Sequence, residues 1–331
     1  MRIQPKTIMC AVDFSNFTDS ILSYSVKLCK EFQAKLFLIH VVIDVKTFFK
    51  YSDTIFDAEM MQAEQFQNAQ KLLEDLTKDL TISHEVFVTQ GDPADEISRF
   101  ALEKKIDMVI SATHGNSGIK RFLIGSVTEK LMKTLHCPLL VLHAQKHDFI
   151  SLAETEIKLK RILVGCDFSS DSKLAFDYGV SLAQEFQAEL YLAHVINPSE
   201  LIELKASDYI DVNPGDYISW HSPNYFEMQR RFKEERRERV NELRSQLEKQ
   251  LYFMLPEECR SWCNPKTVLL DGEPYKELIN YAREQQIDMI VLGIHGHTLW
   301  EKLMVGSTTD RVIRNSPCPV LAVRQMNGDK G

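Results

Sequence analysis

The chain has 331 residues, of which 44% are hydrophobic and 26% are charged, and its formal net charge is −8. This length is enough for two domains with a core each. The negative charge argues against a broad basic surface for nucleic acid or anionic lipid. No apolar stretch approaches the ~18 residues that span a bilayer, and Asp13 interrupts the first apolar run, so we expect neither a signal peptide nor a membrane anchor.

The first half of the sequence alternates short apolar runs with longer amphipathic ones. Near-continuous apolar runs, typical of strands covered on both faces, occupy residues 7–12, 35–42, 85–89, 107–112 and 138–143. Helical patterns lie near residues 17–32, 57–80, 93–104 and 126–136. Strands that alternate with helices predict right-handed crossovers and a parallel sheet.

The second half repeats the first. Residues 8–15 (IMCAVDFS) return as 162–169 (ILVGCDFS), and residues 104–115 (KKIDMVISATHG) return as 285–296 (QQIDMIVLGIHG). Such self-similarity in the same order indicates a duplicated domain. Equivalent strands are expected at residues 161–166, 189–195, 266–270, 288–293 and 319–324. The predicted fold is α/β: two tandem Rossmann-like domains, each a doubly wound parallel sheet of about five strands flanked by helices, over residues 1–148 and 158–326.

The second copy carries an insertion between its second and third strands. Asp13 and Asp167 are 154 positions apart, whereas Gly115 and Gly296 are 181 apart, so the second copy has about 27 additional residues. They fall around residues 197–232, where prolines and a glycine predict a loop. A helix rich in arginine and glutamate should follow at 235–250; interleaved charges favour a solvated helix face over a nucleic-acid contact.

Candidate binding residues cluster where strands of the second copy end. Ligands of a doubly wound sheet bind beyond the carboxyl ends of its strands, where the strand order reverses. Asp167 follows the first strand and can accept hydrogen bonds from a ribose. Gly293-Ile-His-Gly296 follows the fourth strand and allows a phosphate close to the backbone. Gly306-Ser307 opens the last helix, whose free N–H groups and dipole favour an anion.

The spacing Gly-x2-Gly-x9-Gly-Ser, after a strand that ends in Asp-Phe-Ser, resembles the ATP-binding signature of the universal stress protein (UspA-like) family. The resemblance covers both halves of the chain apart from the insertion. It implies adenine near the valine that ends the second strand, ribose on the aspartate, and phosphates on the glycines and serine. The nucleotide-binding residues it implies in the second copy are Asp167, Val195, Gly293, Gly296, Gly306, Ser307 and Thr308.

The first copy matches the same signature less completely. Its corresponding residues are Asp13, Val41, Ala112, Gly115, Gly125 and Ser126. Ala112 replaces the first glycine, and a methyl group that crowds the ligand would make this second site degenerate. The resemblance implies ATP or a related adenine nucleotide as the ligand, with Mg²⁺ as a candidate companion. It also implies that the two domains pair through their last strands, so that one chain imitates a dimer of single domains.

The serines and aspartates of the signature also have a structural interpretation. Ser126 and Glu129 form a capping-box pattern, and Ser307 with Asp310 nearly forms one. The aspartates that follow the first strands can cap the adjoining turns. These structural interpretations require no ligand, and the sequence alone does not decide between them and nucleotide binding.

Histidines and cysteines offer further alternatives. His40 and His194 lie in apolar strands, which favours hydrogen-bonded core histidines, whereas His295 in the glycine loop suits either a phosphate neighbour or loop packing. Cys259 and Cys263 form a close pair, but a zinc site needs more ligands than these two, so no metal site is expected. Most cysteines lie in apolar runs and look like reduced, buried thiols, which predicts a cytoplasmic protein.

No catalytic set is recognisable: the sequence has no Walker lysine, nucleophile elbow or convincing pair of carboxylates. We therefore expect a cytoplasmic stress-response protein that binds nucleotide mainly in the second domain and acts on an unidentified protein partner as a non-catalytic regulatory module. One alternative is a nucleotide-hydrolysing or nucleotidyl-transferring enzyme. Another is a non-nucleotide interaction protein that works through the insertion, whose aromatic side chains suit an interface. Those aromatic residues are Tyr209, Tyr217, Trp220, Tyr225 and Phe226.

Overall fold

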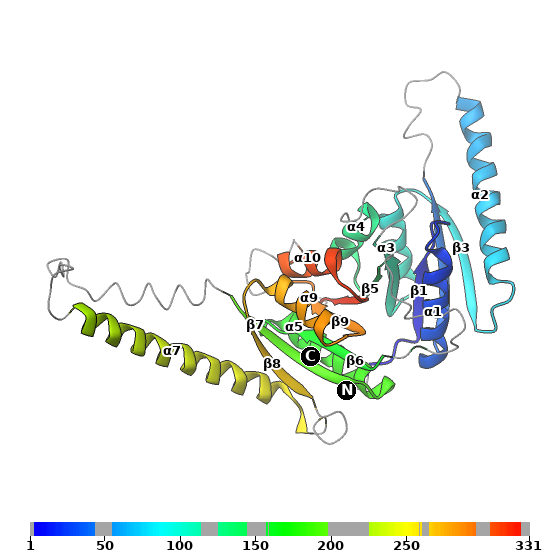
Figure 1. The fold of residues 1–331 in the computed structure, drawn as a ribbon. Helices are drawn as coiled ribbons and strands as arrows, with labels where there is room; N and C mark the ends of the chain where they lie inside the picture. Colours follow the sequence, from blue (N-terminus) through cyan, green and yellow to red (C-terminus); the bar gives the residue numbers. More distant parts are fainter. Residues whose placement is uncertain are drawn as a thin grey trace.

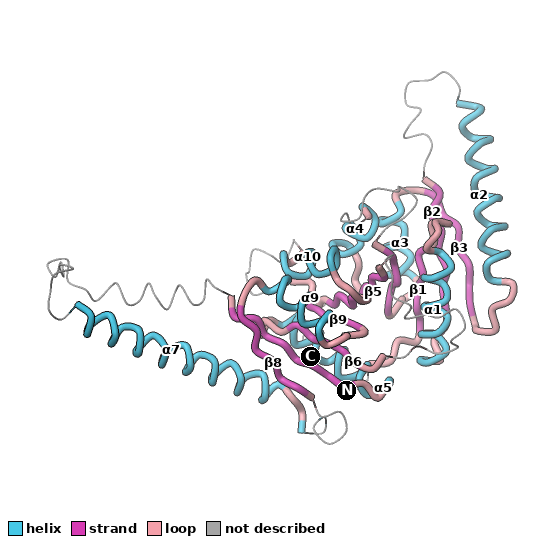
Figure 2. Tube along the Cα trace, viewed as in Figure 1, coloured by secondary structure: helices cyan, strands magenta, loops and turns pink. Residues whose placement is uncertain are grey.

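The computed structural model describes residues 3–43, 55–113, 125–143, 157, 159–197, 225–257, 259, 265–295 and 305–325. In these residues, ten strands form one sheet in the order β3-β2-β1-β4-β5-β10-β9-β6-β7-β8. Helices cover both faces of this mostly parallel sheet (Figure 1 and Figure 2). The predicted α/β fold with two doubly wound halves is confirmed.

The first domain contributes one end of the sheet. Its strands are β1 (Thr7–Ala11), β2 (Lys35–Val42), β3 (His84–Gln90), β4 (Met108–Ala112) and β5 (Leu139–Leu142). Its helices are α1 (Thr18–Phe32), α2 (Ile55–Thr77), α3 (Pro93–Glu103) and α4 (Ser126–Thr134). β1 pairs in parallel with both β2 and β4, so the strand order reverses between β1 and β4.

The second domain repeats this arrangement. Its strands are β6 (Arg161–Gly165), β7 (Glu189–Ile196), β8 (Lys266–Asp271), β9 (Met289–Gly293) and β10 (Val320–Val323). Its helices are α5 (Ser170–Phe186), α7 (Tyr225–Met254), α9 (Pro274–Glu284) and α10 (Ser307–Asn315). The strand order reverses between β6 and β9, in the same way as in the first domain.

The predicted loop of the insertion needs one correction. The predicted loop includes residues 225–232, but these residues form the first part of α7. The reason is local: after Pro223 the sequence has no proline or glycine and is rich in glutamate, glutamine, methionine and arginine, which favour helix. The rest of the predicted loop, residues 198–224, lies outside the described part of the chain.

The charged face of α7 is solvated, as predicted. Arg230 and Arg231 are exposed and lie 3.0 and 3.6 Å from Glu234 and Glu227, respectively, each one helical turn away. α2 and α7 stand at opposite ends of the sheet, beside β3 and β8 (Figure 1).

The two domains meet at the centre of the sheet. β10 pairs antiparallel with β5, and Val320 lies opposite Val141. On one face of the sheet, the rings of Phe32 and Phe186, at the ends of α1 and α5, meet edge to face with their centroids 5.9 Å apart. A hydrophobic core on each face runs through both domains.

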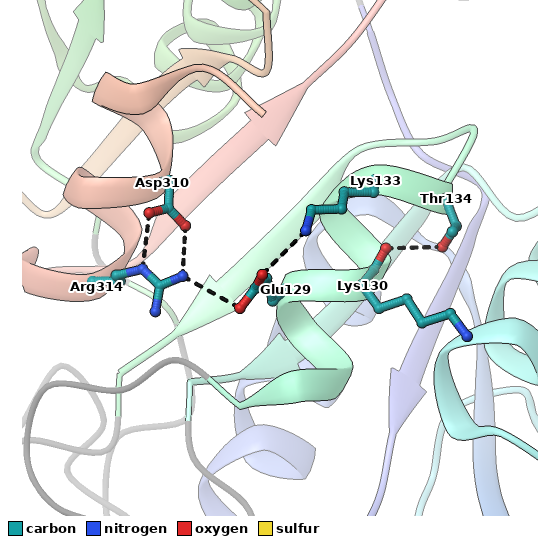
Figure 3. Close-up of polar contacts among 6 residues, drawn as sticks. All are labelled: Glu129, Lys130, Lys133, Thr134, Asp310 and Arg314. Atoms are coloured by element: carbon teal, nitrogen blue, oxygen red, sulfur yellow. Dashed lines mark hydrogen bonds and ion pairs between the residues drawn. The ribbon is translucent and has the colours of Figure 1, made fainter. Parts of the chain in front are cut away.

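On the other face, α4 and α10 lie side by side and carry a small charge network (Figure 3). Arg314 Nη2 is 2.9 Å from Asp310 Oδ1 and 3.4 Å from Glu129 Oε2, while Lys133 Nζ is 3.1 Å from the other oxygen of Glu129. Each helix thus has an internal i,i+4 ion pair, and the Arg314–Glu129 pair joins the two domains.

Each domain also caps the last helix of the other. Arg324, just beyond β10, donates hydrogen bonds to the carbonyl groups of Met132 and Lys133 near the end of α4. His143, just beyond β5, places Nε2 2.5 Å from the carbonyl oxygen of Ile313 near the end of α10. Carbonyl groups at a helix end have no partner within the helix, so these contacts satisfy them.

The cysteines behave as small apolar residues. Cys10, Cys29, Cys166, Cys259 and Cys318 are free and buried, and Cys137 is free and half-buried. Burial raises the pKa of the Cys10 thiol to about 12, so it stays protonated. These positions agree with the predicted reduced thiols; Cys263 lies outside the described residues.

Candidate functional site

A cavity of about 300 Å³ lies at the carboxyl ends of β6, β7 and β9, where the strand order of the second domain reverses. Six of the predicted nucleotide-binding residues line it although they are far apart in sequence: Asp167, Val195, Gly293, Gly306, Ser307 and Thr308. The seventh, Gly296, lies outside the described residues. A cavity of this volume at a topological switch point is typical of a small-molecule site.

Asp167 sits in a tight turn between β6 and α5. Its Oδ1 accepts a hydrogen bond from the backbone nitrogen of Ser169 at 3.0 Å, and Phe168 between them has a φ of 63°. Asp13 makes the same turn after β1, with Ser15 N at 3.0 Å. The turn-capping interpretation of both aspartates is confirmed. A carboxylate has several acceptor positions, so this turn leaves Asp167 able to accept a ribose hydroxyl as well.

The strand-end histidines are core residues, as predicted. His194 is 7% exposed, and its Nδ1 is 2.8 Å from the carbonyl oxygen of Cys166, so Nδ1–H donates. His40 makes the same bond to Val12 at 2.8 Å. Burial lowers the pKa of His40, and the hydrogen bond to Val12 and the charge on Asp13 oppose this shift. These bonds fix the ends of β2 and β7 to the turns that carry the aspartates.

The capping-box interpretation of the signature serines is wrong. Gly125 and Gly306 are the N-caps of α4 and α10, and no side chain of the described residues makes a capping hydrogen bond to either helix. Ser126 and Ser307 are instead the first helical residues. Both glycines have the extended backbone that an N-cap needs, and this shifts each serine one position into the helix.

The start of α10 offers hydrogen-bond donors at the cavity. Asp310 N donates to Gly306 O at 3.0 Å, which closes the first turn of the helix, so the amides of the three residues between them precede the hydrogen bonds within the helix. Thr309 Oγ1 donates to the carbonyl oxygen of Gly293 at 2.7 Å and ties the helix start to the end of β9. An anion in the cavity would meet these amides and the positive end of the helix dipole.

The close approach that Gly293 permits is that of α5. A Cβ atom at this position would lie 2.7 Å from the carbonyl carbon of Asp171 and 2.9 Å from the backbone nitrogen of Ser172. Contacts this short do not occur between real atoms, so glycine is needed for the first turn of α5 to pack on β9. A methyl group at this position of the second domain would therefore meet α5. The crowding of a ligand by Ala112 in the first domain stays a prediction.

Asp171 was missed by the sequence reasoning. It is 5% exposed, and its Oδ2 lies 2.8 Å from His295 Nδ1 and 3.1 Å from the His295 backbone nitrogen. Its Oδ1 accepts a hydrogen bond from Gln325 N at 3.0 Å, beyond β10. One carboxylate thus joins the start of α5, the glycine loop and the end of the last strand. The available signal was the difference between the copies, because Phe17 stands at this position in the first.

The first domain has a cavity of about 900 Å³ at the equivalent place. Its lining includes five of the six residues of the predicted second site, Asp13, Val41, Ala112, Gly125 and Ser126; Gly115 lies outside the described residues. Residues of α2 also line this cavity, among them Asn68, Ala69 and Leu72, whereas no described side chain of α7 lines the second cavity.

Among the residues that the structure describes, no group of three or more histidine, cysteine, aspartate or glutamate side chains could hold a metal ion. Within the same ranges, no helix combines the length and apolar character needed to cross a membrane.

Comparisons with known proteins agree with the fold. The model of the universal stress protein family matches residues 5–143, 158–211 and 219–324. A universal stress protein of Methanocaldococcus jannaschii, MJ0531, is 31% identical over 146 residues, which are 43% of this chain and 85% of that protein. YxiE of Bacillus subtilis, also a universal stress protein, is 30% identical over 168 residues, covering 50% of this chain and 98% of its own.

A solved structure shares the two-domain arrangement. The crystal structure of a universal stress protein from Archaeoglobus fulgidus covers 98% of this chain and 100% of its own with a TM-score of 0.63, at 19% identity. This likeness concerns the fold. The two sequence relatives each match about half of this chain, as expected for proteins whose length corresponds to one of its two repeats.

Proposed function

Because the chain belongs to the universal stress protein family, we propose that its second domain binds ATP or a related adenine nucleotide in the cavity at the ends of β6, β7 and β9. One observation carries this proposal: Asp167, Val195, Gly293, Gly306, Ser307 and Thr308 line a single cavity beside the start of α10. Adenine lies against Val195, the ribose hydroxyls donate to Asp167, and the phosphates accept from the amides of α10 and from the Ser307 hydroxyl.

The geometry at the start of α10 favours a phosphate-binding role for Ser307 over a purely structural role as a helix cap. Since Gly306 is the N-cap and no side chain caps α10, the Ser307 hydroxyl is not used to cap its own helix. Ser307, Thr308 and Thr309, which carry the first three amides of the helix, all line the cavity. Mg²⁺, when present, accompanies the phosphates.

We further propose that the protein is a cytoplasmic, non-catalytic regulatory module. Nucleotide binding changes the conformation of the glycine loop or of the start of α10, and a protein partner binds differently to the two states. Residues 1–148 and 158–326 form its two domains, and their pairing through β5 and β10 makes one chain the equivalent of a dimer. The first domain has a second, degenerate site.

Ser307→Asp and Ser126→Asp test the proposal in matched positions. An aspartate in the first turn of a helix favours the helix dipole, so each variant should keep its fold, but its charge repels a phosphate. We expect Ser307→Asp to weaken ATP binding at least about 30-fold, because the variant loses a charge-assisted hydrogen bond and also repels the phosphate. Ser126→Asp should leave the main binding event unchanged.

The measurement is calorimetric titration of Mg²⁺-ATP into nucleotide-stripped protein, with circular dichroism to verify the fold. ADP, AMP and cyclic AMP in the same titration define which nucleotide is preferred. If Ser126→Asp rather than Ser307→Asp abolished the main ATP-binding transition, the nucleotide site would lie in the first domain. Binding that neither variant weakens would reject the helix N-termini as the phosphate sites.

A further inference from the structure

A buried carboxylate holds a histidine ring at the wall of the second cavity. Asp171 Oδ2 accepts a hydrogen bond from the His295 backbone nitrogen, so this oxygen is an acceptor. The 2.8 Å contact with the ring therefore has Nδ1–H as its donor. Nε2 is then the ring nitrogen left for a ligand. The ring is 18% exposed, and His295 is among the residues that line the cavity.

We propose that His295, oriented by Asp171, binds a phosphate group of the nucleotide through Nε2–H in its protonated form, so that binding in the second domain takes up a proton. This inference rests on the proposed function. When Nδ1–H donates to Asp171, a neutral ring has only a lone pair at Nε2, so Nε2 must gain a proton before it can donate to a phosphate oxygen. Asp171 is a positioning residue: it fixes the ring and the first amide of the glycine loop with one oxygen.

The titratable groups near the ring can be named for the part of the chain that the structure describes. Among the described residues that line the cavity, the other titratable ones are Cys166, Asp167 and His194. Burial raises the pKa of Cys166, which keeps its thiol neutral. Behind the ring, Asp171 attracts Arg324 beyond β10, and this attraction opposes the lowering of the Arg324 pKa by burial. The bound phosphate and the carboxylate of Asp171, 2.8 Å from the ring, thus supply the negative charge that faces a protonated His295.

This arrangement is specific to the second domain. Phe17 occupies the position of Asp171 in the first copy and can neither accept a hydrogen bond nor pair with a charge. A nucleotide in the first domain should therefore bind without proton uptake through this device. The orienting carboxylate is thus a difference between the two repeats, although both have a histidine in the glycine loop.

Matched variants separate the ligand role of His295 from a structural one. His295→Asn keeps an N–H near the Nδ1 position for Asp171 but removes Nε2. His295→Gln reaches the Nε2 position with a neutral N–H that takes up no proton. Asp171→Asn keeps the size of the side chain and removes its charge. Asp177→Asn is the control, because it makes the same change at an exposed position on the same helix.

The experiment is titration of Mg²⁺-ATP into the full chain at pH 6 and pH 8, in pairs of buffers with different ionisation heats, which gives the protons taken up on binding. The nucleotide's own protonation is common to all variants. At pH 6 the wild type should bind Mg²⁺-ATP about tenfold more tightly than His295→Asn, because the variant loses one charge-assisted hydrogen bond. His295→Asn and Asp171→Asn should take up fewer protons than wild type, and Asp177→Asn should match it.

His295→Gln should recover part of the affinity at pH 6 without recovering the proton uptake, a split that a purely structural role would not produce. Equal affinity and equal proton uptake in wild type and His295→Asn would overturn the inference and leave nucleotide binding intact. No binding by the wild type at either pH would reject the proposed function, and the role of His295 with it.

Discussion

The two domains share one topology, yet their cavities differ about threefold in volume, about 900 Å³ in the first and about 300 Å³ in the second. Part of the difference is the lining: α2 contributes to the first cavity, while the side chains of α7 that the structure describes do not contribute to the second. A duplicated sheet therefore preserves where a cavity forms, and the helices beside it decide its size and character.

The starts of the first helices show the same divergence in detail. α5 has Ser169 as its N-cap, whose side chain accepts a hydrogen bond from Ser172 N at 3.2 Å, whereas α1 has Phe17 as its N-cap and no side-chain cap. In the register of the repeat, α5 begins two residues earlier than α1. Its additional first-turn residues pack against Gly293 and place Asp171 beside the glycine loop.

The largest expected effect comes from making the two domains alike at this contact. Gly293→Ala should destabilise the second domain by about 2–3 kcal/mol, because its methyl group would overlap the backbone of Asp171. Urea unfolding followed by tryptophan fluorescence measures this, since Trp220, Trp262 and Trp300 all belong to the second repeat.

Ala112→Gly in the first domain is the matched control. Glycine costs roughly 0.5–1 kcal/mol in an element interior, so this change should destabilise the protein by less than about 1 kcal/mol. Equal, small effects of both variants would contradict the packing role of Gly293 and return the glycine to a purely ligand-related role.

A smaller effect concerns the pH dependence of the first domain. The pKa of His40 is lowered by burial, so the unfolded chain binds a proton more readily than the folded one. His40 therefore adds no penalty above the unfolded pKa of about 6.5, and stability falls as the pH drops below that value toward the folded pKa. Because the ring is partly exposed, the loss should stay below about 1 kcal/mol.

His40→Asn tests this effect, since its amide can still donate to the carbonyl of Val12 but does not titrate. Thermal midpoints of wild type and variant should converge between pH 7 and pH 5, as wild type loses stability relative to the variant. If the difference between the two thermal midpoints stayed constant over this range, protonation of His40 would not be coupled to unfolding.

The smallest effect lies where the domains meet. The Arg314–Glu129 pair is 3.4 Å long and partly exposed, so it should contribute only about 0.5 kcal/mol. A double-mutant cycle with Arg314→Met and Glu129→Gln measures the coupling. A coupling above about 2 kcal/mol would mean that this network, rather than β5, β10 and the shared cores, dominates the junction.

The sequence predicted the strands almost residue by residue, because strands buried on both faces must be continuous apolar runs, as β2 and β9 are. It also predicted the core role of His40 and His194, since a polar ring in an apolar strand needs a hydrogen-bond partner. The meeting of Asp167, Val195 and Gly306 followed from topology, as all lie at the carboxyl edge of one sheet.

Other features could not be predicted from local pattern. The contact between Asp171 and His295 joins residues 124 positions apart, and neither side chain is unusual in its own segment. The capping-box prediction failed because Gly306 rather than Ser307 adopts the N-cap conformation. The role of Gly293 depends on where α5 begins, which hydrophobic periodicity defines only within a few residues.

Photolabelling with 8-azido-ATP tests the central claim most directly, because it reports which domain holds the adenine. Irradiation of the full chain should label peptides of the second domain that contain β7 or the end of β9, near Val195, and excess unlabelled ATP should remove the label. Labelling confined to β1 and β2 of the first domain, or labelling that excess ATP does not displace, would contradict a nucleotide site in the second domain.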